Sequence, residues 1–315
     1  TDSSVYTPDT GLCTNTSDPR RRLACVVRGG SLVKNLTITG KEAPGVGPSR
    51  TIRHTYSGGL FDRLGRGFLG FKRRDTYDLA SSRHTTILYD SSSFTELTAG
   101  SAIYVYPHAL RPSSVTVDID TSQGPNSHHR DTRSANYSVD TNVNNSRFTV
   151  LLQDITKTSV DCESDGAGGC LGTPRVLGWV TETYDYDQIL NYNAMGKPTK
   201  HVTTYKDANG NALRTDTETV SYTGFDSANW LMPAGQIQTA STSTTVTPTE
   251  TVTRTVKYVP DPGVNTTTNL LTGDMKSVEF EPSGDASVRR RVTFGRDSRG
   301  RVKTESDGVV WSATF

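Results

Sequence analysis

Four cysteines are the most reactive side chains of the 315-residue chain, and they fall into two local pairs. Cys13 shortly precedes Cys25, and Cys162 shortly precedes Cys170. Four cysteines allow three pairings, and we predict the local one, because each pair then closes a short loop. On the chain-entropy estimate, each bridge would stabilise its loop by roughly 2–3 kcal/mol. Disulfides form in oxidising compartments, so this pairing predicts a secreted protein or one at the cell surface.

Metal binding is the other chemistry that this part of the sequence suggests. Neither cysteine pair has the close spacing of a zinc site, and no histidine lies at ligand spacing beside them. Asp161, Glu163 and Asp165 resemble the first half of a calcium loop, in which alternating carboxylates surround the cation. The bidentate glutamate that completes such a loop is missing, so the sequence favours an acidic hairpin closed by a disulfide.

Acid–base chemistry has two candidate clusters. His128 and His129 lie near Asp131, but adjacent side chains diverge on an extended chain, so we interpret these histidines as exposed loop residues. Asp185 and Asp187 alternate along a predicted strand and share one solvated face, which does not form a glycosidase pair. The motifs of serine hydrolases, zinc proteases and phosphate-binding loops are missing from the sequence. We therefore predict a protein that is not an enzyme and that binds no cofactor.

A glycine- and phenylalanine-rich run lies between residues 56 and 71. Gly65, Gly67 and Gly70 match the dinucleotide-binding fingerprint, but the residues that follow have no helical apolar period. The glycines instead favour a tight turn held by its own aromatic side chains, with arginines bonding turn carbonyls or nearby aspartates. The motif residues are Phe61, Asp62, Arg63, Gly65, Arg66, Gly67, Phe68, Gly70 and Phe71.

Composition favours strands over helices along the whole chain. Only 33% of the residues are hydrophobic, and threonine and serine are abundant. We therefore predict an all-β fold of thin, layered sheets. The net charge of +1 would not attract nucleic acid, and no apolar run has the length of a membrane helix. The sequence thus predicts neither a nucleic-acid partner nor a membrane span.

Strands are predicted at 32–39, 51–56, 72–78, 84–89, 102–106, 114–120 and 148–153. Residues 121–146 are polar, and we expect a long loop or a ragged hairpin there. The sequence becomes repetitive near residue 178. We accordingly divide the chain into an unassigned N-terminal segment with a disulfide-type loop (1–49), a sheet region around the glycine-rich motif (50–177) and a region of repeated hairpins (178–315).

In the third region, short units recur in which an aromatic residue is followed by an aspartate and then a glycine. The aspartate can bond the turn backbone, the glycine supplies a left-handed residue, and the aromatic side chain packs beside the turn. Such units predict hairpins that stack on their neighbours in sequence. Their marker residues are Tyr184, Asp185, Tyr205, Asp207, Gly210, Phe294, Asp297, Gly300 and Arg301.

Together these motifs resemble the Rhs/YD-repeat shell proteins, which include the B-components of insecticidal toxin complexes. Residues 65–71, Gly-Arg-Gly-Phe-Leu-Gly-Phe, contain the family's Arg-Gly-Phe-Leu-Gly-Phe signature, and the hairpin units resemble its Tyr-Asp-x-x-Gly-Arg repeat. The segment at Trp230 resembles a connector between repeats. Residues 107–112 resemble a Pro-aromatic-x-Gly-Arg-Pro element whose glycine is absent here.

The resemblance implies a curved or spiralling antiparallel sheet of hairpins that forms one sector of a hollow, cocoon-like shell. Such a shell encapsulates a toxic C-terminal polypeptide before delivery, and a largely polar inner face would hold that cargo unfolded. The implied partners are flanking shell segments, from the same or a companion polypeptide, and the enclosed toxin. We expect the chain to be a piece of a longer protein. The alternative is an extracellular adhesion or carbohydrate-binding module that contacts a glycan or receptor through Tyr184, Tyr186 and Trp230.

Overall fold

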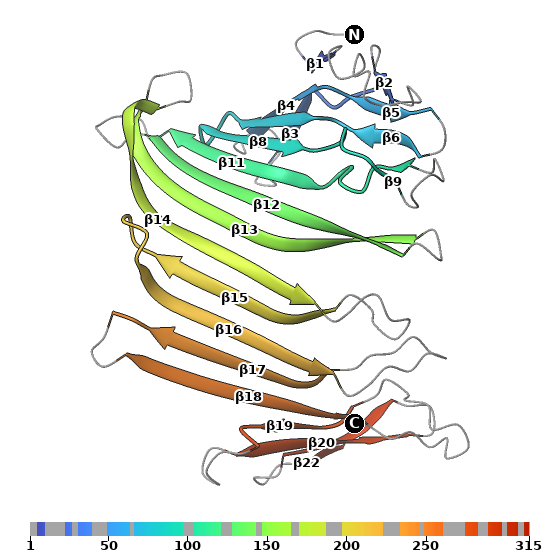
Figure 1. Cartoon of the computed structure of the whole chain (residues 1–315), viewed down its shortest axis with the longest axis vertical. Helices are drawn as coiled ribbons and strands as arrows, with labels where there is room; N and C mark the ends of the chain where they lie inside the picture. Colours follow the sequence, from blue (N-terminus) through green and yellow to red (C-terminus); the bar gives the residue numbers. More distant parts are fainter. Residues whose placement is uncertain are drawn as a thin grey trace. The chain divides into compact units, whose positions relative to one another are not determined.

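The computed structural model describes residues 5–9, 23–26, 31–39, 49–63, 66–96, 104–120, 128–142, 147–164, 170–186, 197–222, 234–245, 249–260, 275–282, 289–297, 301–307 and 312–314. Regular structure in these ranges consists of β-strands, which confirms the predicted all-β class (Figure 1). Among the described residues, no helix has the length and apolar character that a membrane span requires.

The strands are β1 (Tyr6–Thr7), β2 (Leu23–Cys25), β3 (Asn35–Thr39), β4 (Ser49–Ser57), β5 (Leu60–Asp62), β6 (Gly67–Gly70), β7 (Arg73–Asp78), β8 (Arg83–Tyr89), β9 (Thr95–Glu96), β10 (Tyr104–Val105), β11 (Pro112–Asp120), β12 (His128–Asn142), β13 (Arg147–Ser164), β14 (Cys170–Tyr186), β15 (Pro198–Lys206), β16 (Ala212–Tyr222), β17 (Ala234–Ser243), β18 (Glu250–Pro260), β19 (Met275–Phe280), β20 (Arg290–Arg296), β21 (Val302–Asp307) and β22 (Ser312–Thr314).

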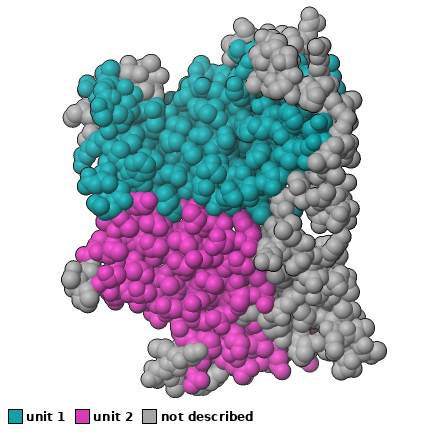
Figure 2. All heavy atoms as spheres, viewed as in Figure 1, with its two compact units in different colours: residues 1–181, 207–211 teal, residues 182–206, 212–315 magenta. Residues whose placement is uncertain are grey.

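Two compact units make up the chain (Figure 2). The first comprises residues 1–181 and 207–211, and the second comprises residues 182–206 and 212–315. The regions predicted from the sequence are 1–49, 50–177 and 178–315. The first two are separate in that division, whereas the first compact unit contains both. The strand β14 contains the division at residue 181.

The first unit is built on an antiparallel meander. β3, β4, β7, β8, β11, β12 and β13 lie side by side in this order, each antiparallel to the next. The short strand β1 adds a parallel pairing to β4, so the sheet is mixed rather than purely antiparallel. β12 and β13 are long, curved strands (Figure 1).

The prediction of a loop or ragged hairpin over residues 121–146 is wrong, because β12 covers His128–Asn142 with paired strands on both sides. Polar partners on the neighbouring strands replace the apolar alternation that usually marks a strand. Arg130 bonds Asp118 on β11, and Asn136 bonds Asp154 on β13. A strand stabilised by such cross-strand pairs has no hydrophobic periodicity to reveal it.

A hydrophobic core lies beside this sheet, at the glycine-rich motif. β2, β5 and β6 form a separate three-stranded sheet. Leu60 of β5 and Leu69 of β6 are buried together with Tyr106 and Ala109. Of the aromatic side chains expected to hold this turn, Phe61 and Phe68 do not enter the core. They pair across the β5–β6 hairpin and remain 44% and 46% exposed, because alternation along each strand directs the leucines inward instead.

The second unit is a meander in which β15 to β22 follow one another as antiparallel neighbours. Both faces of β15 to β18 are accessible, since none of the side chains assessed there is fully buried. Over these strands the described structure is therefore one sheet thick. Ladder hydrogen bonds and cross-strand side-chain pairs, rather than a hydrophobic core, stabilise such a sheet.

Candidate functional site: aspartate turns, sheet faces and a histidine–carboxylate cluster

Two predicted repeat turns have the same geometry. Asp207 accepts hydrogen bonds from the backbone N–H groups of Asn209 and Asn211, at 2.9 and 2.8 Å. In the same way Asp297 accepts from the Arg301 backbone N–H at 3.0 Å and from the Arg301 guanidinium at 2.8 Å. Gly210 has φ of +85°, the left-handed conformation that this turn requires. The hydrogen bonds to Asn211 lower the pKa of Asp207.

A third turn of this kind was missed in the sequence. Asp78 accepts hydrogen bonds from the Ser81 hydroxyl at 2.5 Å and the Ala80 backbone N–H at 3.2 Å, and its third partner is Arg50 at 2.6 Å. The Ser81 hydrogen bond and the Arg50 guanidinium lower the pKa of Asp78 to about 2. Ser82 has φ of +48°, so the left-handed residue of this turn comes four positions after the aspartate, one later than Gly210 does after Asp207.

The signal that could have found this turn is a recurring tetrapeptide, acid-Thr-Tyr-Asp, at residues 75–78 and 182–185. In each copy the tyrosine stacks on a histidine: Tyr77 on His84 with ring centroids 4.1 Å apart, and Tyr184 on His201 at 4.4 Å. The acidic residue that precedes each tyrosine also faces that histidine. Asp75 lies 3.0 Å from the His84 ring nitrogen, and Glu182 lies 3.7 Å from that of His201.

The two faces of the β15–β18 sheet differ in chemistry. Residues in register share a face, so the pairing assigns each side chain. One face, here called the threonine face, consists of Lys200, Val202, Thr204, Thr215, Thr217, Thr219, Gln238, Ala240, Thr242, Thr251, Thr253 and Thr255. The opposite face, here called the charged face, carries His201, Tyr205, Arg214, Asp216, Glu218, Ser241 and Arg254.

Hydrogen bonds stay within each of these faces. On the threonine face the hydroxyls of Thr242 and Thr251 lie 3.0 Å apart on adjacent strands. On the charged face Arg214 donates to Asp216 at 2.7 Å, and the Ser241 hydroxyl donates to the same carboxylate. The threonine face thus presents mainly hydroxyl and methyl groups, with Lys200 and Lys257 as its charges. The charged face presents ion pairs together with the apolar residues Val220, Ile237, Val252 and Val256.

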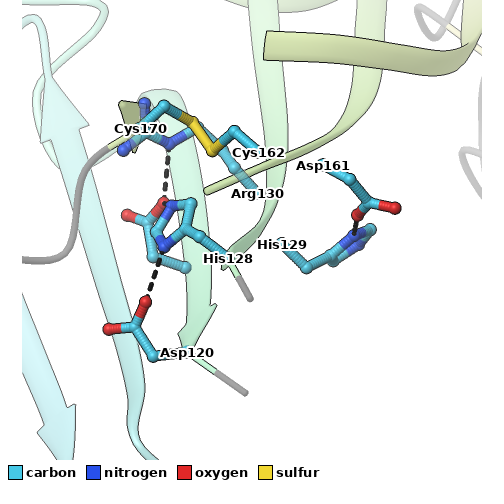
Figure 3. The surroundings of a disulfide bond; sticks show 8 residues. Asp120, His128, His129, Arg130, Asp161, Cys162 and Cys170 are labelled. Atoms are coloured by element: carbon cyan, nitrogen blue, oxygen red, sulfur yellow. Dashed lines mark hydrogen bonds and ion pairs between the residues drawn. A yellow bond between two sulfur atoms is a disulfide. The ribbon is translucent and has the colours of Figure 1, made fainter. Parts of the chain in front are cut away.

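A histidine–carboxylate cluster joins β11, β12 and β13 in the first unit (Figure 3). The side chain of His128 is fully buried, and its two ring nitrogens lie 2.8 Å from Asp120 and 3.0 Å from Asp118. Arg130 donates to Asp118 at 2.6 Å. The interpretation of His128 as an exposed loop residue is therefore wrong: the register of β11 and β12 brings two carboxylates to it.

The opposite face of the same strands carries a second, more accessible pairing. His129 lies 2.7 Å from Asp161 on β13 and 3.2 Å from Asp131 on its own strand. The hydrogen bond to Asp161 raises the pKa of His129. Asp161, one of the candidate calcium ligands, is thus paired with a histidine, Glu163 is exposed, and Asp165 lies outside the described residues.

The predicted disulfide between Cys162 and Cys170 is present, with Cα atoms 5.5 Å apart. It links the end of β13 to the start of β14 and lies beside His128 (Figure 3). Cys25 is also disulfide-bonded, and Cys13 lies outside the described residues, as do Gly65, Trp230 and Gly300.

The remaining motif residues lie within strands or directly beside them. Arg66 donates a backbone hydrogen bond to Asp62 at 3.3 Å, and its guanidinium donates to the Tyr106 carbonyl oxygen. Arg63 lies in the β5–β6 turn, and Phe71 follows β6, where its ring contacts that of Phe68. Asp185, Tyr205 and Phe294 lie in β14, β15 and β20.

Comparison with known proteins finds a likeness in structure only. No protein-family model matches the sequence, and no curated protein matches it. The crystal structure of TcdB2-TccC3 aligns with 82% of this chain at 9% identity and a TM-score of 0.52. That of TcdB2-TccC3-Cdc42 gives 82%, 9% and 0.53. The chain covers 19% and 18% of those two chains, about a fifth of their length. These matches confirm the predicted fold: the chain has the Rhs-like shell fold of a sector of TcdB2-TccC3.

Proposed function

We propose that this chain forms part of the wall of an Rhs-type shell that encapsulates a toxic polypeptide before delivery. The observation that carries the proposal is the alignment of 82% of the chain with the TcdB2-TccC3 fold. A wall has two accessible faces, and the β15–β18 sheet is one layer thick with both faces accessible. We propose a structural role for the chain rather than a catalytic one, in an extracellular protein.

In this proposal the threonine face lines the inside of the shell. An unfolded cargo exposes both apolar side chains and backbone polar groups. A wall of apolar residues would bind it tightly, and a wall of charges would bind segments of opposite charge. Threonine offers hydroxyls that already bond one another, as Thr242 and Thr251 do. Its contacts with a polypeptide are therefore individually weak, and the cargo can leave.

The charged face would then meet solvent outside. Interspersed charges of both signs keep a surface soluble and oppose edge-to-edge aggregation of exposed sheets. Arg214, Asp216, Glu218 and Arg254 supply both signs on this face. The flanking shell segments, from the same polypeptide or a companion, would complete the wall around the enclosed toxin.

Neighbouring positions on β16 provide the test. Thr217 lies on the threonine face and Glu218 on the charged face, so a cysteine at each reports one side of the wall. The protein is prepared as the full-length gene product with its partner polypeptides, and each single variant, Thr217→Cys and Glu218→Cys, is treated with a maleimide on a large polyethylene glycol. The described native cysteines are disulfide-bonded, so they do not compete for the reagent.

We expect modification of Glu218→Cys and protection of Thr217→Cys in the assembled particle, with both modified after denaturation. Equal modification of both variants in the native particle would contradict the wall assignment. Modification of Thr217→Cys alone would reverse the assignment of faces. Specific glycan binding by a monomeric protein, without any enclosed polypeptide, would favour an adhesion module instead.

A further inference from the structure

A buried histidine and two sulfur atoms lie together at the ends of β12 and β13. In the antiparallel register, His128 is directly opposite Cys162. One ring nitrogen of His128 and the sulfur atoms of Cys162 and Cys170 all lie within 4.8 Å of one another. This proximity could not be predicted from the sequence, because no histidine is near either cysteine along the chain. Strand pairing brings them together.

These three atoms are close to the positions that a tetrahedral zinc ion requires. With Zn–S near 2.3 Å and Zn–N near 2.0–2.1 Å, ligand atoms of a tetrahedral site are about 3.5–3.8 Å apart. The sulfur atoms would separate by about 2 Å after reduction, which side-chain rotation at two cysteines can provide. The imidazole nitrogen would approach by about 1 Å.

The surroundings of His128 are those of a metal ligand. A ligating histidine usually donates its second ring N–H to a carboxylate, which fixes the orientation of the ring. Here Asp120 lies 2.8 Å from Nδ1, and Asp118 lies 3.0 Å from Nε2. If Nε2 binds the ion, its hydrogen bond with Asp118 is lost, Asp120 keeps the opposite N–H, and Asp118 keeps its 2.6 Å hydrogen bond from Arg130. The imidazole is fully buried and Cys162 is 5% exposed, so water competes little for these positions.

We propose that reduction of the Cys162–Cys170 disulfide converts this place into a zinc site with Cys162, Cys170 and His128 as ligands and water in the fourth position. A dithiol reductant transfers two electrons to the disulfide, becomes a disulfide itself and leaves two protein thiols. Zn²⁺ then displaces one proton from each thiol and binds both thiolates. A second disulfide compound can accept the two electrons of the thiolates and be reduced to two thiols, which reforms the protein S–S bond and releases the ion, so the disulfide and the metal exclude each other.

The two states suit the two compartments that an exported protein encounters. Thiols remain reduced in the cytosol, where zinc could link β13 to β14 before a disulfide can form. The disulfide takes over that link in an oxidising environment. The zinc ion and the disulfide each link β13 to β14, so this hairpin is cross-linked in both compartments.

Cobalt(II) is the probe, because its thiolate complexes absorb in the near ultraviolet and its tetrahedral complexes absorb in the visible. The protein is reduced with a phosphine, exchanged into oxygen-free buffer and titrated with Co²⁺, while far-ultraviolet circular dichroism verifies that it stays folded. We expect both absorptions to saturate at a single ion per chain and to disappear when Zn²⁺ is added. The oxidised protein should show neither. Absence of both absorptions from the folded, reduced protein would overturn the proposal.

Two double variants identify the sulfur ligands. Cys13→Ser with Cys25→Ser leaves the proposed ligands in place and should retain the cobalt spectrum. Cys162→Ser with Cys170→Ser should abolish the thiolate absorption. The reverse result would place the metal at the other cysteine pair and refute the proposal. Since replacing the buried His128 can prevent folding, the nitrogen ligand is identified by X-ray absorption of the zinc-loaded wild type. Two sulfur neighbours near 2.3 Å and a nitrogen near 2.0 Å support the site, and four sulfur neighbours refute it.

Discussion

Leu110 allows a direct measurement of the backbone strain in this fold. It has φ of +66°, a left-handed conformation that is costly for a residue with a Cβ atom. The Pro-aromatic-x-Gly-Arg-Pro element that residues 107–112 resemble carries glycine at this place. Leu79, in the β7–β8 turn, is a matched control, because both leucines are 61% exposed and Leu79 lacks a positive φ.

The informative change is the step from alanine to glycine, which removes only the Cβ atom. At position 110 this step relieves about 1–2 kcal/mol of left-handed strain and adds about 0.4–1 kcal/mol of unfolded-state entropy cost. On the middle of these ranges, Leu110→Gly should therefore be more stable than Leu110→Ala by about 0.8 kcal/mol. At position 79 only the entropy cost remains, so Leu79→Gly should be less stable than Leu79→Ala by about 0.4–1 kcal/mol.

The free energy of unfolding of the four variants is measured by urea denaturation followed by circular dichroism, with a common m-value as the condition for comparison. The expected result is an opposite sign of the alanine-to-glycine step at the two positions. A destabilising step of equal size at both would refute the reasoning. It would mean that the left-handed conformation at position 110 carries no strain that removal of the Cβ atom relieves.

Two further predictions concern aspartate turns. The pKa of Asp78 is lowered to about 2, so its ionised form stabilises the fold above the ordinary aspartate pKa of 3.8, and this contribution disappears as the pH falls toward 2. The unfolding midpoint of Asp78→Asn should thus lie below that of the wild type at neutral pH and approach it near pH 2; a constant difference would contradict the assignment. Asp207→Ala should speed amide hydrogen exchange at Asn209 and Asn211, whose N–H groups bond that carboxylate, whereas Asp207→Asn keeps an acceptor and should retain part of the protection. Unchanged exchange in Asp207→Ala would show that the turn does not depend on its aspartate.

The local features of this fold could be predicted from the sequence. Asp207 and Gly210 lie within one turn, and their residue types determine its hydrogen bonds and its left-handed residue without help from distant chain. The Cys162–Cys170 bridge was predictable for the same reason. The all-β class followed from composition and repeated turns, since many short units of one type leave few alternative folds.

Features that depend on strand register could not be predicted. His128 and Cys162 are far apart in sequence, and only the pairing of β12 with β13 brings them face to face. β12 itself was missed because its residues are held by polar partners on both neighbours rather than by a buried apolar face. At the glycine-rich motif, the sequence indicated a packed turn, but the choice of Leu60 and Leu69 over Phe61 and Phe68 as core residues depends on which face meets Tyr106.

The thinness of the β15–β18 sheet affects how such a chain can change during evolution. Each strand there is held mainly by the strand before it and the strand after it. The gain or loss of a hairpin therefore disturbs only the strand pairing at the place where it occurs. A globule that lost two strands would have to refill the space they left. This chain would not, so duplication of a short gene segment could enlarge the protein in small steps, each immediately compatible with folding.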